Sequence, residues 1–66
     1  MLKYYFNSKL DIEIMFLKLL QEDIQFFFRT YEASDPTEFV IYEFVVDEND
    51  KDYIDSVCTI LKLKQL

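Results

Sequence analysis

The sequence predicts an α+β fold of order β-α-β-β-α, a two-layer sandwich with two helices on one face of a mainly antiparallel sheet. This would be a half or complete ferredoxin-like fold. Three observations predict it. Segment 38–46 is apolar at almost every position, apolar residues recur at helical spacing after residue 8, and a second such stripe follows residue 50. A chain of 66 residues has room for one domain, 1–66.

The first strand and the first helix are indicated by local signals. Leu2–Phe6 is short, apolar and aromatic, as a strand should be. Ser8 followed by Asp11 resembles a capping box and begins a helix. One apolar face of that helix consists of Ile12, Met15, Phe16, Leu19 and Leu20. A second stripe beside it consists of Leu10, Ile14 and Leu17. The helix is therefore expected to bury more than one face.

The segment Ile24–Tyr31 has two interpretations. Its aromatic and β-branched residues favour a strand, which would place Phe27 and Tyr31 on one face. Alternatively the first helix continues through it, because Glu22-Asp23 contains neither Gly nor Pro to end a helix. We predict the strand.

The run Glu38–Val46 predicts a strand that is apolar on both faces. Val40, Tyr42, Phe44 and Val46 would lie on one face, and Phe39, Ile41 and Val45 on the other. A half-buried strand alternates apolar and polar residues instead. Because so short a chain is too small to cover both sides of a sheet, something outside the domain is expected to cover the second face.

Asn49 or Asp50 is expected to cap a final helix, with Lys62 and Lys64 near its negative end. The tail 61–66 also alternates with period two, so a short fourth strand is an alternative there. Ala33–Thr37, which contains the single Pro, predicts a loop between the second and third strands. The predicted core consists of Tyr4, Phe6, Ile12, Met15, Leu19, Phe26, Phe28, Tyr42, Phe44, Ile54, Val57 and Leu61.

Charge and composition narrow the classes of function. The net charge of −6 disfavours nucleic acid and anionic membranes as partners. The chain lacks His and Gly and has one Cys, so we expect no catalytic site, no metal, no cofactor and no disulfide. No apolar stretch is long enough for a transmembrane helix, and no signal peptide is recognised, so a reducing cytoplasm is the expected location.

Individual candidate sites are weak. Asp47, Asn49 and Lys51 resemble the start of a calcium loop, but Asp52 replaces its Gly and Cys58 its chelating Glu. On its apolar stripe, Cys58 itself is expected to be a core residue. The aromatic residues could form a surface on which nucleic-acid bases stack. Such surfaces are surrounded by basic residues, whereas this chain is acidic.

Glu43 interrupts the apolar second face, and Arg29 on the neighbouring strand could pair with it. We interpret this as a cross-strand ion pair that sets register at an interface, and a small anionic ligand held by Arg29 is the alternative. The predicted interface consists of Phe27, Arg29, Tyr31, Phe39, Ile41, Glu43, Val45, Leu10, Ile14 and Leu17.

The order of these segments resembles a family of small prokaryotic signal-transducing protein domains whose function is largely unassigned. The resemblance rests on a strand leading into Asn7-Ser8, a helix ending in Leu19-Leu20-Gln21-Glu22, a strand after Asp23-Ile24, and Val45-Val46-Asp47-Glu48 before the last helix. Asp23 stands where the family has Gly, and Asp47 where Pro is common. The resemblance covers almost the whole chain and implies no catalytic residues.

Two functions are expected from these patterns. The first is a non-enzymatic regulatory or adaptor domain that forms a homodimer through the apolar sheet face. The alternative is an acidic inhibitor or immunity-type protein that blocks a basic, nucleic-acid-binding protein surface. Carboxylates scattered around both helices would favour the adaptor, and carboxylates along one ridge would favour the inhibitor.

Overall fold

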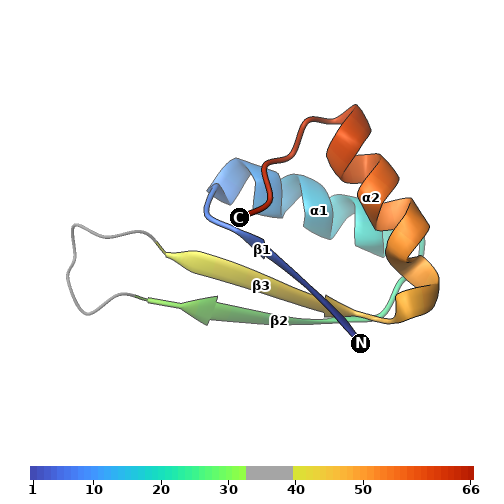
Figure 1. The fold of residues 1–66 in the computed structure, drawn as a ribbon, viewed down its shortest axis with the longest axis horizontal. Helices are drawn as coiled ribbons and strands as arrows, with labels where there is room; N and C mark the ends of the chain where they lie inside the picture. The colour runs from blue at the N-terminus through green and yellow to red at the C-terminus, as the bar shows by residue number, and fades with distance from the viewer. Residues whose placement is uncertain (33–39) are drawn as a thin grey trace.

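The computed structural model describes residues 1–32 and 40–66, and the element order is β-α-β-β-α as predicted (Figure 1). The strands are β1 (Leu2–Phe6), β2 (Phe26–Tyr31) and β3 (Ile41–Val46). The helices are α1 (Lys9–Gln21) and α2 (Lys51–Ile60), and a 3₁₀ turn, η1 (Glu48–Asp50), precedes α2. The predicted loop 33–37 and the predicted strand positions 38 and 39 lie outside the described residues.

The sheet has the order β1-β3-β2, and both strand pairs are antiparallel. Both helices lie on the same side of it (Figure 1). The fold is α+β and consistent with a half ferredoxin-like arrangement. Its central strand is β3, which pairs with β1 on one edge and with β2 on the other.

The core lies between the helices and one face of the sheet. Phe16 of α1 packs against Phe26, Phe28 and Phe44, with ring centroids 5.5, 4.7 and 5.1 Å away. The buried apolar residues are Tyr4, Phe6, Ile12, Met15, Leu19, Phe44, Val46, Ile54, Val57, Cys58 and Leu63. Eight of the twelve predicted core residues are therefore confirmed, and Phe26 and Tyr42 pack against them while partly buried. The predictions of Phe28 and Leu61 are wrong, because Phe28 is 37% and Leu61 41% exposed, and Leu63 is buried where Leu61 was expected.

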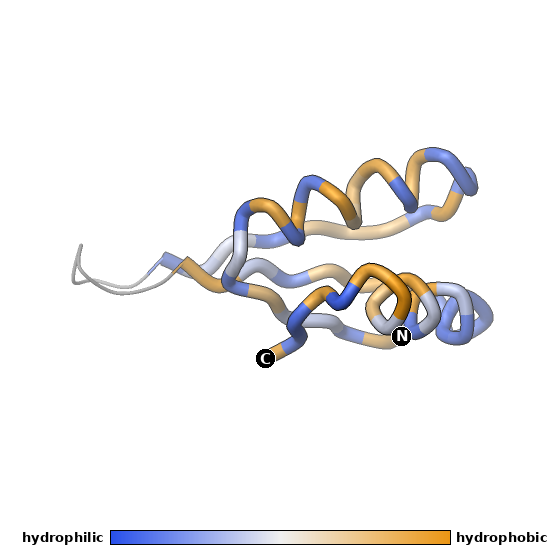
Figure 2. Tube along the Cα trace, turned by 90° about the horizontal axis from the view of Figure 1, so that it is seen from above, coloured by the Kyte–Doolittle hydropathy of each residue, from blue (hydrophilic) through white to orange (hydrophobic). Residues whose placement is uncertain are grey.

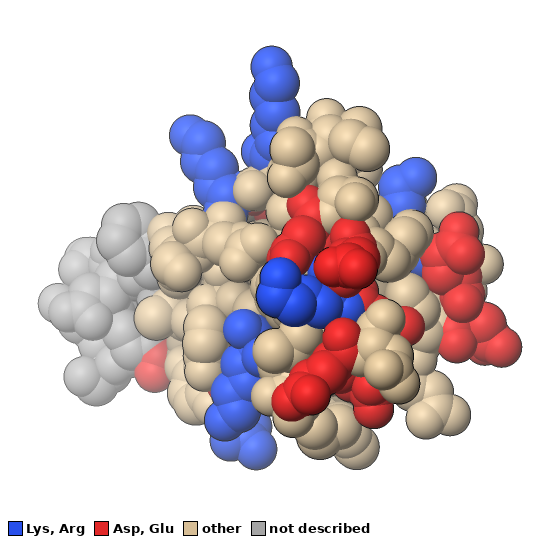
Figure 3. All heavy atoms as spheres, turned by 45° about the vertical axis from the view of Figure 1, so that its right-hand side comes forward, with Lys and Arg blue, Asp and Glu red and all other residues tan. Residues whose placement is uncertain are grey.

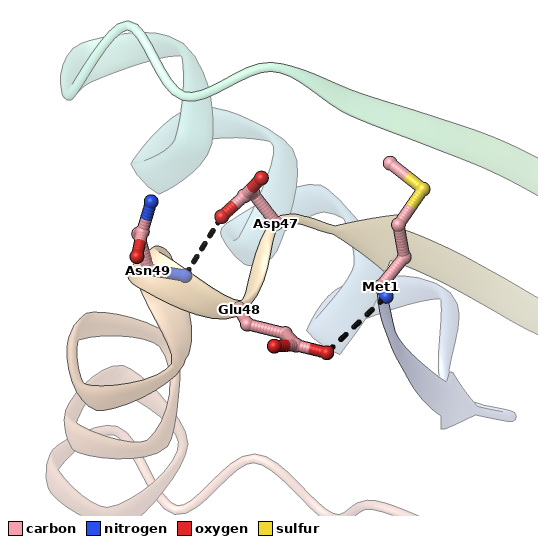
Figure 4. A network of polar contacts seen from close by, with 4 residues as sticks. All are labelled: Met1, Asp47, Glu48 and Asn49. Atoms are coloured by element: carbon pink, nitrogen blue, oxygen red, sulfur yellow. Dashed lines mark hydrogen bonds and ion pairs between the residues drawn. The ribbon is translucent and has the colours of Figure 1, made fainter.

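Two side chains cap the starts of helical segments. Ser8 accepts a hydrogen bond from the backbone N–H of Asp11 at 3.4 Å, as the sequence predicts. At the other end of the chain the cap is Asp47, whose Oδ1 accepts from the backbone N–H of Asn49 at 2.9 Å and so begins η1 (Figure 4). Asp50 occupies the N-cap position of α2 without a side-chain hydrogen bond. Asn49 and Asp50 therefore do not cap through their side chains.

Both helices end in the same way, at a residue with positive φ. Asp23 follows α1 with φ 55°, and Lys62 follows α2 with φ 56°. The next residue then bonds back across the helix end, Ile24 N–H to the Leu19 carbonyl and Leu63 N–H to the Cys58 carbonyl, each at 2.9 Å. The left-handed Asp23 excludes the long-helix alternative. The turn at Lys62 reverses the chain and brings Leu63, not Leu61, onto the core.

The tail 61–66 does not form a fourth strand. It runs beside β1 and donates one backbone hydrogen bond, from Leu66 N–H to the Tyr5 carbonyl at 2.9 Å. The Lys64 N–H also donates to Asp11 Oδ2 at 3.1 Å. Since α2 ends at Ile60, Lys62 lies beyond its last turn, which contains no basic residue. Lys62 and Lys64 thus follow the negative end of this helix, near it as expected but outside its last turn.

Candidate protein-binding site

The face of the sheet opposite the helices, called the open face below, brings most of the predicted interface residues together. The register places Arg29 opposite Glu43, Phe27 opposite Val45 and Tyr31 opposite Ile41. From β1, Lys3 and Tyr5 stand opposite Val45 and Glu43 on the other side. The open face therefore consists of Lys3, Tyr5, Phe27, Arg29, Tyr31, Ile41, Glu43 and Val45. Phe39 lies outside the described residues.

The apolar part of the open face is exposed to solvent. The side chain of Phe27 is 68% exposed, that of Tyr31 42% and that of Ile41 38%. Val45, between Phe27 and Lys3 in the register, is half-buried. Large side chains that stand together in water mark interaction sites more often than scattered ones do. The parity that the sequence predicted for β2 and β3 is thus confirmed.

Glu43 lies at the centre of the open face and is only 2% exposed. Its Oε2 accepts a hydrogen bond from the Tyr31 hydroxyl at 3.3 Å, and Arg29 Nη1 donates to the same hydroxyl at 3.3 Å. Among the described residues Arg29 and Glu43 form no direct ion pair. The predicted cross-strand register is therefore confirmed, but the predicted direct ion pair is wrong, because the Tyr31 hydroxyl stands between the two groups.

The electrostatics of this cluster hold the hydroxyl proton of Tyr5 in place. Hydrogen bonding to Glu43, and burial second, raise the pKa of Tyr5 above its ordinary value. The hydrogen bond to Tyr31 raises the pKa of the Arg29 guanidinium, which also lies 5.9 Å from the centroid of the Tyr31 ring. A carboxylate surrounded by hydroxyls and a cation is a satisfied polar centre within an apolar surface. These hydrogen bonds fix the positions of the Glu43, Tyr31 and Arg29 side chains on the open face.

Two shallow hollows flank Phe27 on this side of the molecule. One is lined by Arg29, Glu43 and Val45 together with Phe27 and Phe28. The other lies at the end of the sheet, between Met1, Ile24, Asp47 and the start of β2. The N-terminal amine stands near this end, 3.5 Å from Glu48 Oε1 (Figure 4). Hollows beside an exposed aromatic ring can accept bulky side chains from a partner.

The remaining predicted interface residues lie elsewhere. Leu10, Ile14 and Leu17 belong to α1, in the other layer of the molecule, where Leu10 is 65% and Leu17 60% exposed. Apolar residues recur along the length of this helix (Figure 2). The ten predicted residues therefore do not form one surface. Sequence reasoning also omitted Lys3 and Tyr5, although their alternation with the core residues Tyr4 and Phe6 places them on the open face.

The other candidate groups have structural roles. Cys58 is buried, and burial raises the pKa of its thiol, so it packs as an apolar residue. The calcium-like segment begins with Asp47, whose carboxylate accepts the Asn49 N–H instead. Within residues 1–32 and 40–66, no three His, Cys, Asp or Glu side chains are arranged to hold a metal ion.

Comparison with known proteins assigns the chain to no family. No protein-family model matches the chain, and neither a curated protein nor a solved structure is significantly similar to it. The resemblance to signal-transducing domains stays a prediction. In the described part of the chain, both helices are too short and too polar to cross a membrane.

Proposed function

We propose that this chain is a small non-enzymatic regulatory or adaptor domain that acts through protein association, as a homodimer joined by the open face. The observation that carries the proposal is the exposed apolar group Phe27, Tyr31 and Ile41 around the desolvated Glu43. Two sheets packed face to face bury such side chains in a layer about 10 Å thick. A reducing cytoplasm is the compartment proposed for it.

A second copy suits the open face because of how charge is distributed. The whole chain carries a net charge of −6, yet the open face carries Lys3, Arg29 and the buried Glu43. Two copies can therefore approach through this face without bringing exposed carboxylates together. In a dimer with a two-fold axis both copies contribute the same patch, so the open face of each copy covers that of the other.

Size gives a second reason for association. Small single cores contribute little net stability, and the helices of this chain cover only one side of its sheet. Burial of Phe27, Ile41 and Val45 against a partner would add apolar area at roughly 25 cal/mol per Å². The described residues hold neither a disulfide nor a metal cluster that could replace this contribution.

The distribution of carboxylates favours the adaptor over an acidic inhibitor. Asp11 and Glu22 lie at opposite ends of α1, and Glu48 and Asp52 lie on η1 and α2. Figure 3 shows acidic side chains at two separate places on one side of the molecule, with basic side chains beside them. A protein that imitates nucleic acid needs a continuous acidic ridge.

The test is the mass in solution of the purified protein and of Ile41→Glu, measured by sedimentation over a wide concentration range. Ile41 is 38% exposed at the start of β3, so the substitution should preserve the fold. It places a charge in the proposed interface, and we expect it to halve the mass of the wild-type assembly. The matched control is Ile60→Glu, because Ile60 is 75% exposed at the end of α2.

Two results would contradict the proposal. One is a wild-type protein that stays monomeric at every concentration. The other is an equal loss of mass in Ile41→Glu and Ile60→Glu, which would show that added negative charge, not the open face, controls association. Circular dichroism of both variants checks that the fold is retained.

A further inference from the structure

The two edges of the sheet differ in what covers them. Beside β1 runs the C-terminal tail, whose Leu66 N–H donates to the Tyr5 carbonyl. The outer edge of β2 faces outward in Figure 1, and in the described residues no backbone hydrogen bond joins β2 to any segment but β3. Alternate residues of an edge strand point their N–H and C=O groups away from the sheet. These groups of β2 therefore have no protein partner within one copy of the described chain.

The sequence of β2 carries few of the usual protections against strand pairing. Edge strands commonly contain Lys, Pro or a bulge that prevents another strand from adding to them. The six residues of β2 read Phe-Phe-Phe-Arg-Thr-Tyr and pair with β3 in an unbroken register. Arg29 is the single charge, and no carboxylate lies within the strand. In a chain of net charge −6, β2 thus carries no carboxylate that would repel the same strand of a second copy; β1 has a similar charge, with Lys3 alone, but its edge accepts the Leu66 N–H at Tyr5.

We propose that β2 pairs with β2 of a second copy, antiparallel and about a two-fold axis perpendicular to the sheet. This axis continues the sheet from one copy into the next and keeps both helix layers on the same side. The pair would contain six strands in the order β1-β3-β2-β2-β3-β1, and the free backbone groups of each β2 would satisfy those of its copy.

Charge selects the register of the pair. Residues that stand opposite each other must lie on the same face, so the two-fold axis lies midway between the two copies of one β2 residue, which then stand opposite each other. An axis at Arg29 would place two guanidinium groups opposite each other, which destabilises the pair. An axis at Phe28 joins as many residues, places Arg29 opposite Phe27 of the copy, and places the two Phe28 rings opposite each other. We infer the Phe28 register, in which Arg29 can lie over an aromatic ring.

The helix layer supports this arrangement. Phe28 is 37% exposed although it lies on the helix side of the sheet, opposite Phe44 in the register. Phe16 contacts Phe28, and Leu20, one helical turn further along the same flank, is 67% exposed. In the proposed pair the two α1 helices become neighbours. Phe28 and Leu20 then lose contact with water.

The edge pair is independent of the proposed homodimer and can coexist with it. The homodimer is held by the side chains of the open face, whereas the edge pair is held by the backbone of β2, with Phe27 and Arg29 selecting only its register. Where the two two-fold axes intersect at right angles, the contacts together give a tetramer of two six-stranded sheets packed face to face with the helices outside, a closed assembly with D2 symmetry. Each contact can be removed without the other.

Amide hydrogen exchange in Ile41→Glu tests the edge pair, because this variant lacks the proposed face contact. If β2 pairs with its copy, all six amides of Phe26–Tyr31 become protected as protein concentration rises, and the variant sediments as a dimer. A monomer in which alternate β2 amides exchange at unprotected rates at every concentration would overturn the proposal. The edge would then be open to a strand of a different protein.

A pair of variants that are equal in mass and charge tests the same contact. Thr30→Glu adds a charge at an exposed position on the edge, and Thr59→Glu adds the same charge at an exposed position of α2. In the Ile41→Glu background, Thr30→Glu places a carboxylate opposite Phe26 of the copy and is expected to raise the dimer Kd about tenfold or more, and Thr59→Glu to leave it unchanged. Equal effects of the two substitutions would overturn the edge pair and leave the proposed homodimer untouched.

Discussion

Asp23 and Lys62 adopt φ values of 55° and 56° in a chain that contains no glycine. Left-handed backbone costs an ordinary residue roughly 1–2 kcal/mol, and Asp tolerates it better than Lys does. Both residues follow a helix, and both let the next residue bond back to the helix end. Asp23 thus ends α1 with neither Gly nor Pro beside it. Nothing in the local sequence marked Lys62 for the same role.

Replacement of Lys62 by Gly is expected to stabilise the protein by about 1 kcal/mol, because Gly adopts positive φ without a steric cost. Lys64→Gly is the matched control, since Lys64 does not have positive φ and the charge change is the same. Urea denaturation of both variants measures the difference. Equal stabilities for the two variants would contradict a strained Lys62.

At the scale of elements, hydropathy pattern predicted most of the fold. The predicted bounds of β1 are confirmed, and so is the cap at Ser8, because strand period and capping chemistry act within a few residues. The helix C-termini could not be predicted with the same accuracy. Where α2 stops depends on the turn at Lys62, and that turn decides whether Leu61 or Leu63 reaches the core. Tertiary contacts select between the two leucines.

One polar contact joins the first strand to the last helix. The Tyr4 hydroxyl donates to Asp55 Oδ1 at 3.1 Å, and Lys51 Nζ donates to Asp55 Oδ2 at 2.6 Å. Burial, and second the bond to Asp55, raise the pKa of Tyr4 from 10.0 to about 12. The bond from Lys51 is the largest cause that lowers the pKa of Asp55. The folded protein therefore keeps Tyr4 protonated to higher pH than the unfolded chain does.

This contact predicts how stability changes at alkaline pH. The unfolded chain releases the Tyr4 proton near pH 10 and the folded protein near pH 12. The contribution of neutral Tyr4 is therefore fully present below pH 10 and is lost as pH rises toward 12. The Tyr4→Phe variant cannot lose this contribution, because Phe has no hydroxyl proton. The stability of the wild-type protein should therefore fall more steeply with pH than that of the variant. Urea midpoints measured from pH 9 to 11 test this expectation, and parallel curves would contradict it.

At the scale of the whole molecule, the open face was predictable and the Glu43 cluster was not. Alternation along β2 and β3 is enough to place Phe27 and Ile41 on one face, because strand parity depends only on sequence position. Arg29 reaches Glu43 through the Tyr31 hydroxyl and not directly, and this depends on how far each side chain extends across the strands. Leu10 and Leu17 were grouped with this face because apolar pattern alone does not say which layer a helix surface faces.

The most direct test of the open face is nuclear magnetic resonance of a dimer mixed from isotope-labelled and unlabelled copies. Intermolecular magnetisation transfer is expected between the methyl groups of Ile41 and Val45 and the rings of Phe27 and Tyr31. These side chains lie on one surface, and a two-fold contact would bring them within about 5 Å of their copies. Intermolecular signals confined to Leu10 and Leu17 of α1 would contradict association through the sheet.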